Sequence, residues 1–76
     1  MMNGGNNLNR KNFLTSRERE IFELLVKNYD TEEIADKLHI SSKTVRNHIS
    51  NVIQKLDVKG RSQAILELIK MKEITL

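Results

Sequence analysis

The sequence predicts an all-α fold: a compact four-helix domain with a helix-turn-helix at its centre. Three observations carry this prediction. Apolar residues recur every three or four positions from about residue 16 to residue 72, and a capping residue precedes each such segment. The chain has no proline and no convincing run of alternating apolar and polar residues. The expected connections are about two to six residues long, which suits helices packed into one unit.

Length and composition restrict the class of protein. A chain of 76 residues makes one domain and buries only about 60% of its unfolded surface, so dimerisation is a plausible source of stability. The absence of cysteine excludes disulfides and thiolate metal sites, and we expect no metal or other cofactor. No apolar segment approaches the roughly 20 residues of a membrane span, so we expect a soluble, cytoplasmic protein. Residues 1–12, with five asparagines and two glycines, predict a flexible tail, which leaves residues 13–76 as the domain.

The first helix is expected to begin just after Leu14. Thr15 and Glu18 match a capping box, in which a hydroxyl caps the helix and a carboxylate three residues later returns a hydrogen bond. Asn28 suits the left-handed position that ends a helix. The inward side comprises Ile21, Phe22, Leu24 and Leu25.

The second helix, residues 31–38, is short. We expect Thr31 to cap it, with Glu32 and Glu33 favourably placed at the positive end of the helix. A tight turn follows at His39, where a helix-turn-helix usually has glycine. Histidine tolerates a positive φ better than most residues, so the turn is expected to form with some strain. The inward residues are Ile34, Ala35 and Leu38.

The third helix is expected to run from a cap at Ser41 to about Leu56. Its apolar residues form a single stripe at helical spacing: Val45, Ile49, Val52, Ile53 and Leu56. The polar residues on the opposite side and its flanks are Lys43, Thr44, Arg46, Asn47, Ser50, Asn51 and Gln54. His48 lies at the edge of the stripe and is either a partly buried packing residue or a phosphate donor.

This polar side has the chemistry that a helix needs in a DNA major groove. Short hydrogen-bonding side chains allow close approach, arginine pairs with guanine, asparagine pairs with adenine, and no carboxylate repels phosphate. Lys43 lies in the first turn, where the helix dipole also favours a phosphate. Residues 18–36 hold seven acidic against two basic residues, whereas residues 43–61 hold five basic against one acidic. The alternatives are an ordinary solvated helix face and a chance scatter of surface charge.

The fourth helix, about Arg61 to Lys72, follows a weak capping pair of Gly60 and Gln63. The helix is apolar well beyond one face, which indicates a dimer interface. The residues assigned to this interface are Ile65, Leu66, Ile69 and Met71. Alternatively, the surplus wraps a larger core, or Ile74 and Leu76 fold back over it.

Four motifs give the chain a resemblance to a known family. The segments "LTSRERE", "EIADKL", "SSKTVRNHISNVIQKL" and "GRSQA" occur in an order that resembles the LuxR-type DNA-binding domain of bacterial response regulators and quorum-sensing regulators. The resemblance covers about 60 of the 76 residues. It departs from the family pattern in the loop "NYD" and at His39, where family members often have glycine.

The resemblance implies roles for individual residues. Arg46, Asn47 and Ser50 would contact base edges, and Lys43 and Thr44 would hold phosphates of double-stranded DNA. Lys59 and Arg61 would add contacts to the DNA backbone, or would instead pair with Glu18 or Glu20 inside the domain. The second and third helices would form the helix-turn-helix, and the fourth would form a homodimer on pseudo-palindromic sites.

These expectations amount to a transcriptional regulator rather than an enzyme. The chain also resembles a small stand-alone member of the family that regulates spore-coat and germination genes. The acidic residues of the first two helices are a candidate contact for RNA polymerase. The alternatives are an adaptor that heterodimerises without binding DNA and, within the DNA-binding class, region four of a sigma factor. Catalysis is disfavoured because no acid, base and nucleophile occur at a recognisable spacing.

Overall fold

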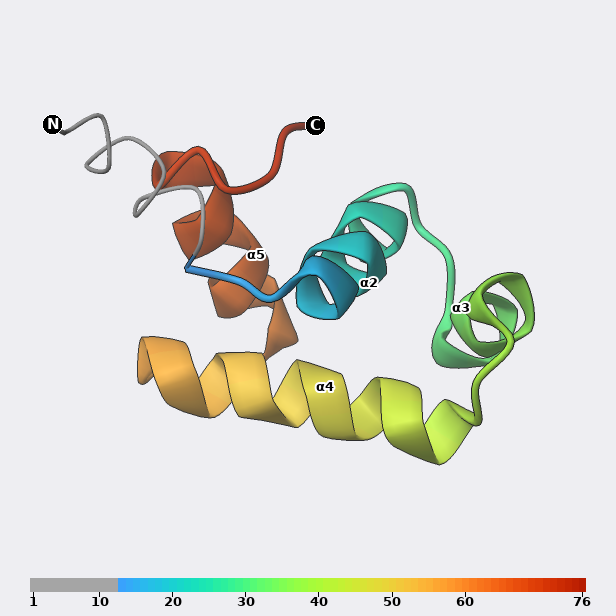
Figure 1. Ribbon diagram of the computed structural model, residues 1–76. Helices are drawn as coiled ribbons and strands as arrows, with labels where there is room; N and C mark the ends of the chain where they lie inside the picture. Colours follow the sequence, from blue (N-terminus) through green and yellow to red (C-terminus); the bar gives the residue numbers. More distant parts are fainter. Residues whose placement is uncertain (1–12) are drawn as a thin grey trace, which may run out of the picture.

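The computed structural model describes residues 13–76, which form four α-helices and no strand (Figure 1). The helices are α2 (Ser16–Val26), α3 (Thr31–Leu38), α4 (Ser42–Leu56) and α5 (Arg61–Lys70). The prediction of an all-α fold is therefore confirmed. The flexible tail predicted for residues 1–12 lies outside the described residues.

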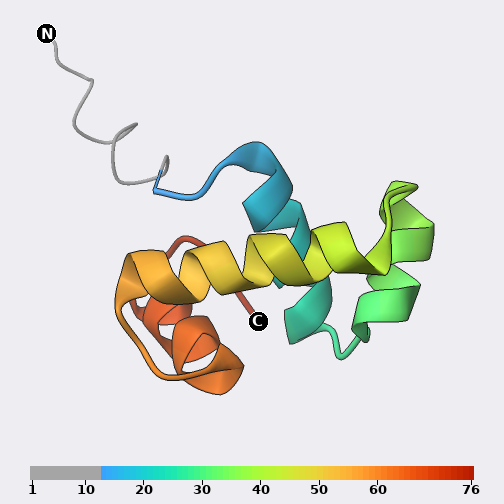
Figure 2. The ribbon, with the colours of Figure 1, turned by 90° about the horizontal axis from the view of Figure 1, so that it is seen from below.

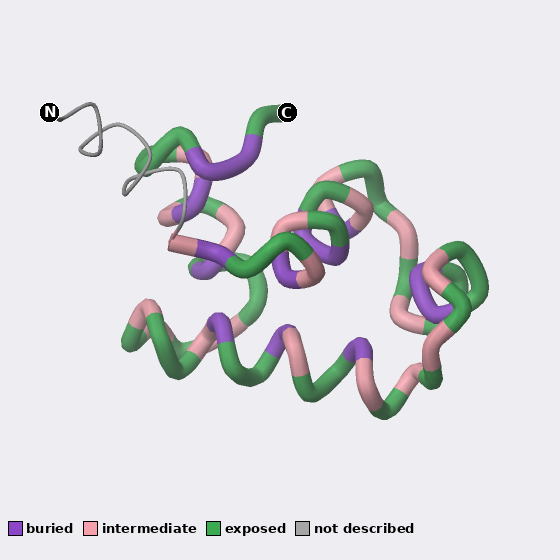
Figure 3. Tube along the Cα trace, viewed as in Figure 1, coloured by how far each residue is buried: buried purple, intermediate pink, exposed green. Residues whose placement is uncertain are grey.

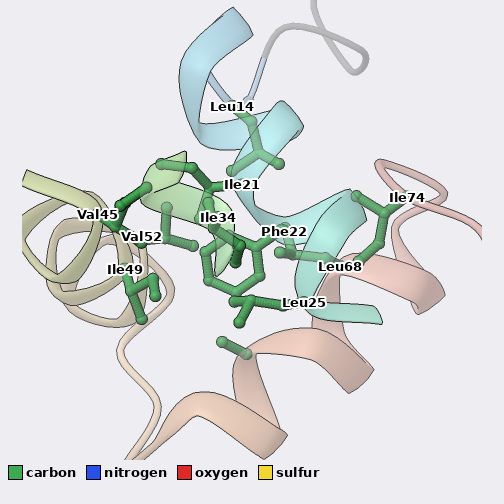
Figure 4. Close-up of a cluster of buried hydrophobic side chains, with 12 residues drawn as sticks. Leu14, Ile21, Phe22, Leu25, Ile34, Val45, Ile49, Val52, Leu68 and Ile74 are labelled. Carbon is green, nitrogen blue, oxygen red and sulfur yellow. The ribbon is translucent and has the colours of Figure 1, made fainter. Parts of the chain in front are cut away.

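The longest helix, α4, organises the domain because α2, α3 and α5 all pack against it. In the second view, α4 runs across most of the molecule, from the loop before α5 to α3 (Figure 2). Its buried positions point toward the other helices, and its other positions are half-buried or exposed (Figure 3). The side chains that converge on the core come from every helix and from both flanking segments (Figure 4). The largest fully buried side chains are Ile21, Phe22, Ile34, Val45, Val52 and Leu68.

The starts of the helices follow from local hydrogen bonding. At α2 the predicted capping box forms, with the Thr15 hydroxyl accepting from the Glu18 N–H at 3.1 Å. At α4 the Ser41 hydroxyl accepts from the Thr44 N–H at 3.0 Å, as predicted. Both caps depend on residues three positions apart, so the sequence contains all the information they need.

The prediction that Thr31 caps α3 is wrong by one residue. Asp30 is the cap: its carboxylate accepts from the Glu33 N–H at 2.9 Å, and Glu33 Oε1 accepts from the Asp30 N–H at 2.9 Å. Starting at Asp30 puts Glu33 at the third helical position, where it completes a capping box. A cap at Thr31 would have put Ile34 there, which has no acceptor.

Helix α5 begins at Arg61 after Gly60, as predicted, but its capping bond and its C-terminal end differ from the prediction. Gly60 is the cap residue but makes no side-chain bond, and Gln63 Oε1 accepts from the Lys59 N–H at 2.8 Å instead. The helix ends at Lys70 rather than Lys72, because Lys72 adopts a left-handed conformation with φ of 63°. This residue turns the chain back toward the core.

The residues after α5 return to α2. The Glu73 carboxylate is buried and accepts from Arg19 Nη2 at 2.8 Å, while Arg19 Nη1 donates to the Glu73 carbonyl oxygen. Ile74 follows into the core, whereas Leu76 is 93% exposed. The chain after α5 therefore folds back onto the core, but it leaves Leu66 on α5 61% exposed.

The turn between α3 and α4 has the strained geometry expected of it. His39 adopts a left-handed conformation with φ of 59°, which lets the Ile40 N–H donate to the Ala35 carbonyl at 3.1 Å. Asn28 is also left-handed, with φ of 75°, after the end of α2. Both residues serve where glycine is the commoner choice, because asparagine and histidine are enriched among non-glycine residues at positive φ.

Candidate nucleic-acid interface

The outer side of α4 is a continuous polar surface. Six of the predicted contact residues on it are exposed: Lys43, Arg46, Asn47, Ser50, Asn51 and Gln54. Thr44 and His48 are half-buried, so His48 contributes to packing and still reaches solvent. The opposite side is anchored by Val45, Ile49 and Val52 (Figure 4). Packing thus fixes the rotation of the helix and leaves one side available to a large partner.

The N-terminus of α4 is suited to an anion. Its first turn contains no acidic residue, in contrast to the first turns of α2 and α3. The Ser41 and Thr44 hydroxyl oxygens lie 2.9 Å apart in a hydrogen bond, which holds the start of the helix in place. Exposed backbone N–H groups, the helix dipole and Lys43 together create a positive end that favours phosphate.

Arg46 has a neighbour that the sequence did not reveal. Its Nη1 lies 4.0 Å from Glu32 Oε2 on α3, and both side chains are more than half exposed. This ion pair joins the two helices of the helix-turn-helix at their solvent edge. The guanidinium is therefore flanked by a carboxylate on one side and by open solvent on the other.

Lys55 belongs to the scaffold rather than to the polar surface. Its Nζ donates to Glu18 Oε1 at 2.9 Å and to the Phe13 carbonyl at 3.1 Å, and it lies 5.1 Å from the centre of the Phe13 ring. Burial raises the pKa of Glu18, but hydrogen bonds from Lys55 and the Thr15 backbone outweigh it and hold that pKa below its ordinary value. The carboxylate is thus ionised at neutral pH and ties α2 to α4.

The same contacts exclude one of the alternatives for Lys59 and Arg61, that they pair with Glu18 or Glu20. Glu18 is taken by Lys55, and Glu20 lies 3.2 Å from Arg17 within α2. Neither carboxylate pairs with Lys59 or Arg61, and both of these cations are exposed at the start of α5. They remain available to a polyanion beyond the C-terminal end of α4.

Helix α5 carries a separate apolar surface. Leu66 is 61% exposed and Met71 is 36% exposed, while Ile65 and Ile69 are half-buried. Beside them lies an open groove of about 410 Å³ lined by Val58, Gln63, Leu66, Glu67, Ile69 and Lys70. Large exposed leucine and methionine side chains beside a groove are typical of a protein-contact surface.

Other kinds of site find no support in residues 13–76. No group of three or more histidine, aspartate or glutamate side chains in this range is placed to hold a metal ion. Within the same range, no helix is long and apolar enough to cross a membrane.

Comparison with known proteins assigns the family. The model of the family described as bacterial regulatory proteins, luxR family, matches residues 12–68, which include the whole of α2, α3 and α4 and most of α5. The chain belongs to this family. The short helix α3, the left-handed turn at His39 and the capped helix α4 form the predicted helix-turn-helix.

Individual relatives agree with the family model. Spore germination protein GerE of Bacillus subtilis is 65% identical over 66 residues, which cover 87% of this chain and 89% of GerE. A solved structure of the transcription factor GerE matches with a TM-score of 0.82 at 65% identity, covering 83% of this chain and 94% of that one. The expectation that the chain is not an enzyme is confirmed by these relatives, which are transcription regulators.

A longer relative matches over one part only. Transcriptional regulatory protein DegU of Brevibacillus brevis is 47% identical over 57 residues, which cover 75% of this chain and 24% of DegU. The chain thus spans about a quarter of DegU but most of GerE. The roles of the individual α4 residues remain predictions, since neither the family nor these relatives test them.

Proposed function

We propose that this LuxR-family transcription regulator binds pseudo-palindromic promoter sites as a homodimer and controls late sporulation genes for the spore coat and germination. The observation that supports DNA recognition is that the polar side of α4 has no carboxylate and faces outward, while Val45, Ile49 and Val52 are buried on the opposite side. The sporulation role is supported by the 65% identity to a spore germination protein over nearly the whole of both chains.

Recognition divides between bases and phosphates. Arg46, Asn47 and Ser50 lie on successive outward positions of α4 and reach base edges, since arginine pairs with guanine and asparagine with adenine in the major groove. Lys43 and Thr44 hold phosphates at the helix start. The remaining contacts, which flank these or follow the backbone, come from His48, Asn51, Gln54, Lys59 and Arg61.

The homodimer forms through α5. Its proposed contact residues are Ile65, Leu66, Ile69 and Met71, of which Leu66 has the largest exposed fraction. Pairing this surface with a second copy would cover the apolar groove and place two α4 helices in successive major grooves about 34 Å apart. Apart from Glu32, which lies beside Arg46, the exposed carboxylates of α2 and α3 are a candidate surface for RNA polymerase.

Selection of bound duplexes from a random DNA pool tests this function. The expected result is an enriched sequence with two inverted half-sites about one helical turn apart. A variant carrying both Arg46→Ala and Asn47→Ala should enrich the same sequence poorly, whereas Lys27→Ala, at the end of α2, serves as a control. A folded protein that enriches no sequence would overturn the proposal and favour an adaptor that acts through protein contacts alone.

A further inference from the structure

The first turn of α3 carries one carboxylate that helix capping does not use. Asp30 and Glu33 satisfy each other's backbone N–H groups in the capping box. Glu32, between them, points outward with its side chain 75% exposed. The interaction recorded for its carboxylate is with Arg46 on α4, at 4.0 Å.

The position of Glu32 affects which group Arg46 can bind. A guanidinium presents five N–H donors in a planar fork, so one edge can face a carboxylate while another binds a second acceptor. If that acceptor is the O6/N7 edge of guanine, it is neutral and tolerates the nearby carboxylate. If it is a phosphate, two anions share one cation and repel each other.

Lys43 shows the contrasting arrangement on the same helix. No acidic residue lies in the first turn of α4, and Lys43 has no carboxylate within ion-pair distance among residues 13–76. An unaccompanied cation at a helix N-terminus is suited to phosphate. The two cations at this end of α4 thus differ in their surroundings, one with an acidic neighbour and one without.

We propose that Glu32 is a positioning residue for DNA recognition, which directs Arg46 toward a guanine edge and away from the phosphate backbone. Glu32 does not itself contact DNA in this account; it acts through Arg46. The inference rests on the proposed function, because it requires Arg46 to meet duplex DNA. It predicts that removing the Glu32 charge lowers discrimination between bases without lowering overall affinity for DNA.

The test compares Glu32→Gln with Glu23→Gln, which removes an exposed charge from α2. Binding is measured by fluorescence anisotropy on the duplex selected by the unmodified protein and on four versions of it. All four versions change the guanine at which Arg46→Ala relaxes preference. Three replace it with adenine, cytosine or thymine, and the fourth replaces it with 7-deazaguanine, which lacks the N7 acceptor. Because exposed ion pairs are weak, we expect Glu32→Gln to reduce discrimination at that position about two- to fivefold. Glu23→Gln should leave the discrimination unchanged.

A double variant separates failure of this inference from failure of the proposed function. In the Arg46→Ala background, Glu32→Gln should cause no further loss of discrimination. Equal effects of Glu32→Gln and Glu23→Gln, or a loss that persists without Arg46, would overturn the inference and leave DNA recognition intact. If Arg46→Ala itself weakens all sequences equally, the assignment of Arg46 to a base fails first and the inference fails with it.

Discussion

The ion pair between Glu18 and Lys55 makes the clearest stability prediction. Glu18 is 5% exposed and accepts from Lys55 Nζ at 2.9 Å and from the Thr15 N–H at 3.0 Å. Lys55→Met keeps the apolar stem of the side chain against Phe13 but removes the charge. The buried carboxylate then loses one charge-assisted hydrogen bond, which is worth about 1.5–3 kcal/mol in a dry site.

The partial exposure of Lys55 reduces this figure. About a third of its side chain is accessible to solvent, at 34%, so water replaces some of the lost interaction. We therefore expect Lys55→Met to lower the free energy of unfolding by about 1–2 kcal/mol near pH 7. For a domain of this size that corresponds to a fall in Tm of about 5–15 °C. Arg17→Met is the matched control, because its pair with Glu20 is exposed and lies within α2, away from the proposed dimer surface.

The dependence on pH follows from the direction of the Glu18 shift. Its pKa is lower in the folded protein than the ordinary value of 4.5, so its contribution to stability is present above that value. The contribution is lost as the pH falls through the lowered pKa of the folded state. Lys55→Met should therefore cost most above about pH 5, and the difference from the unmodified protein should shrink toward pH 3.

Urea unfolding at several pH values and fixed protein concentration measures both effects. The expected result is a difference between Lys55→Met and the unmodified protein that narrows at low pH, with little change for Arg17→Met. An equal loss of stability at pH 3 and pH 7 would show that Lys55 acts through packing alone. A loss as small as that of the control would refute the assignment of this pair as a link between α2 and α4.

Three further predictions concern DNA binding and assembly. Arg46→Ala should cost about 1–3 kcal/mol of binding to the selected duplex and relax preference at one base position; uniform weakening on all duplexes would assign Arg46 to phosphate. Lys43→Ala should reduce the magnitude of the negative slope of log affinity against log salt concentration by about one per monomer, as measured by anisotropy titrations. Lys27→Ala should leave this slope unchanged. An unaltered slope for Lys43→Ala would remove Lys43 from the phosphate contacts. Leu66→Glu should give a folded monomer in sedimentation velocity, and a variant that stays dimeric would place the interface elsewhere than on α5.

Sequence reasoning succeeded where the determinants are local. The caps at Thr15 and Ser41 depend on residues three positions apart, and the left-handed residues at Asn28 and His39 follow from the ends of adjacent helices. The shift from Thr31 to Asp30 is a local error, because two adjacent residues are both good caps and only the acceptor at the third helical position distinguishes them.

Contacts between distant segments could not be predicted from the sequence. Lys55 is one of the five basic residues of the segment 43–61, and nothing in its neighbourhood indicates its partner Glu18, which is 37 residues away. The pair of Arg19 and Glu73 joins residues 54 positions apart, and only the fold brings them together. The pairing of Glu32 with Arg46 likewise depends on how α3 crosses α4, which the sequence pattern does not show.

Protection of guanine from methylation on the selected duplex is the most direct test of the central claim, that the outer side of α4 enters the major groove. Dimethyl sulfate modifies guanine N7, which lies in the major groove, and adenine N3, which lies in the minor groove. If α4 enters the major groove, guanine N7 atoms should be protected in two half-sites whose centres lie about one helical turn apart. Arg46→Ala should abolish that protection. Tight binding that leaves guanine N7 reactive throughout, or that protects only adenine N3, would contradict the claim.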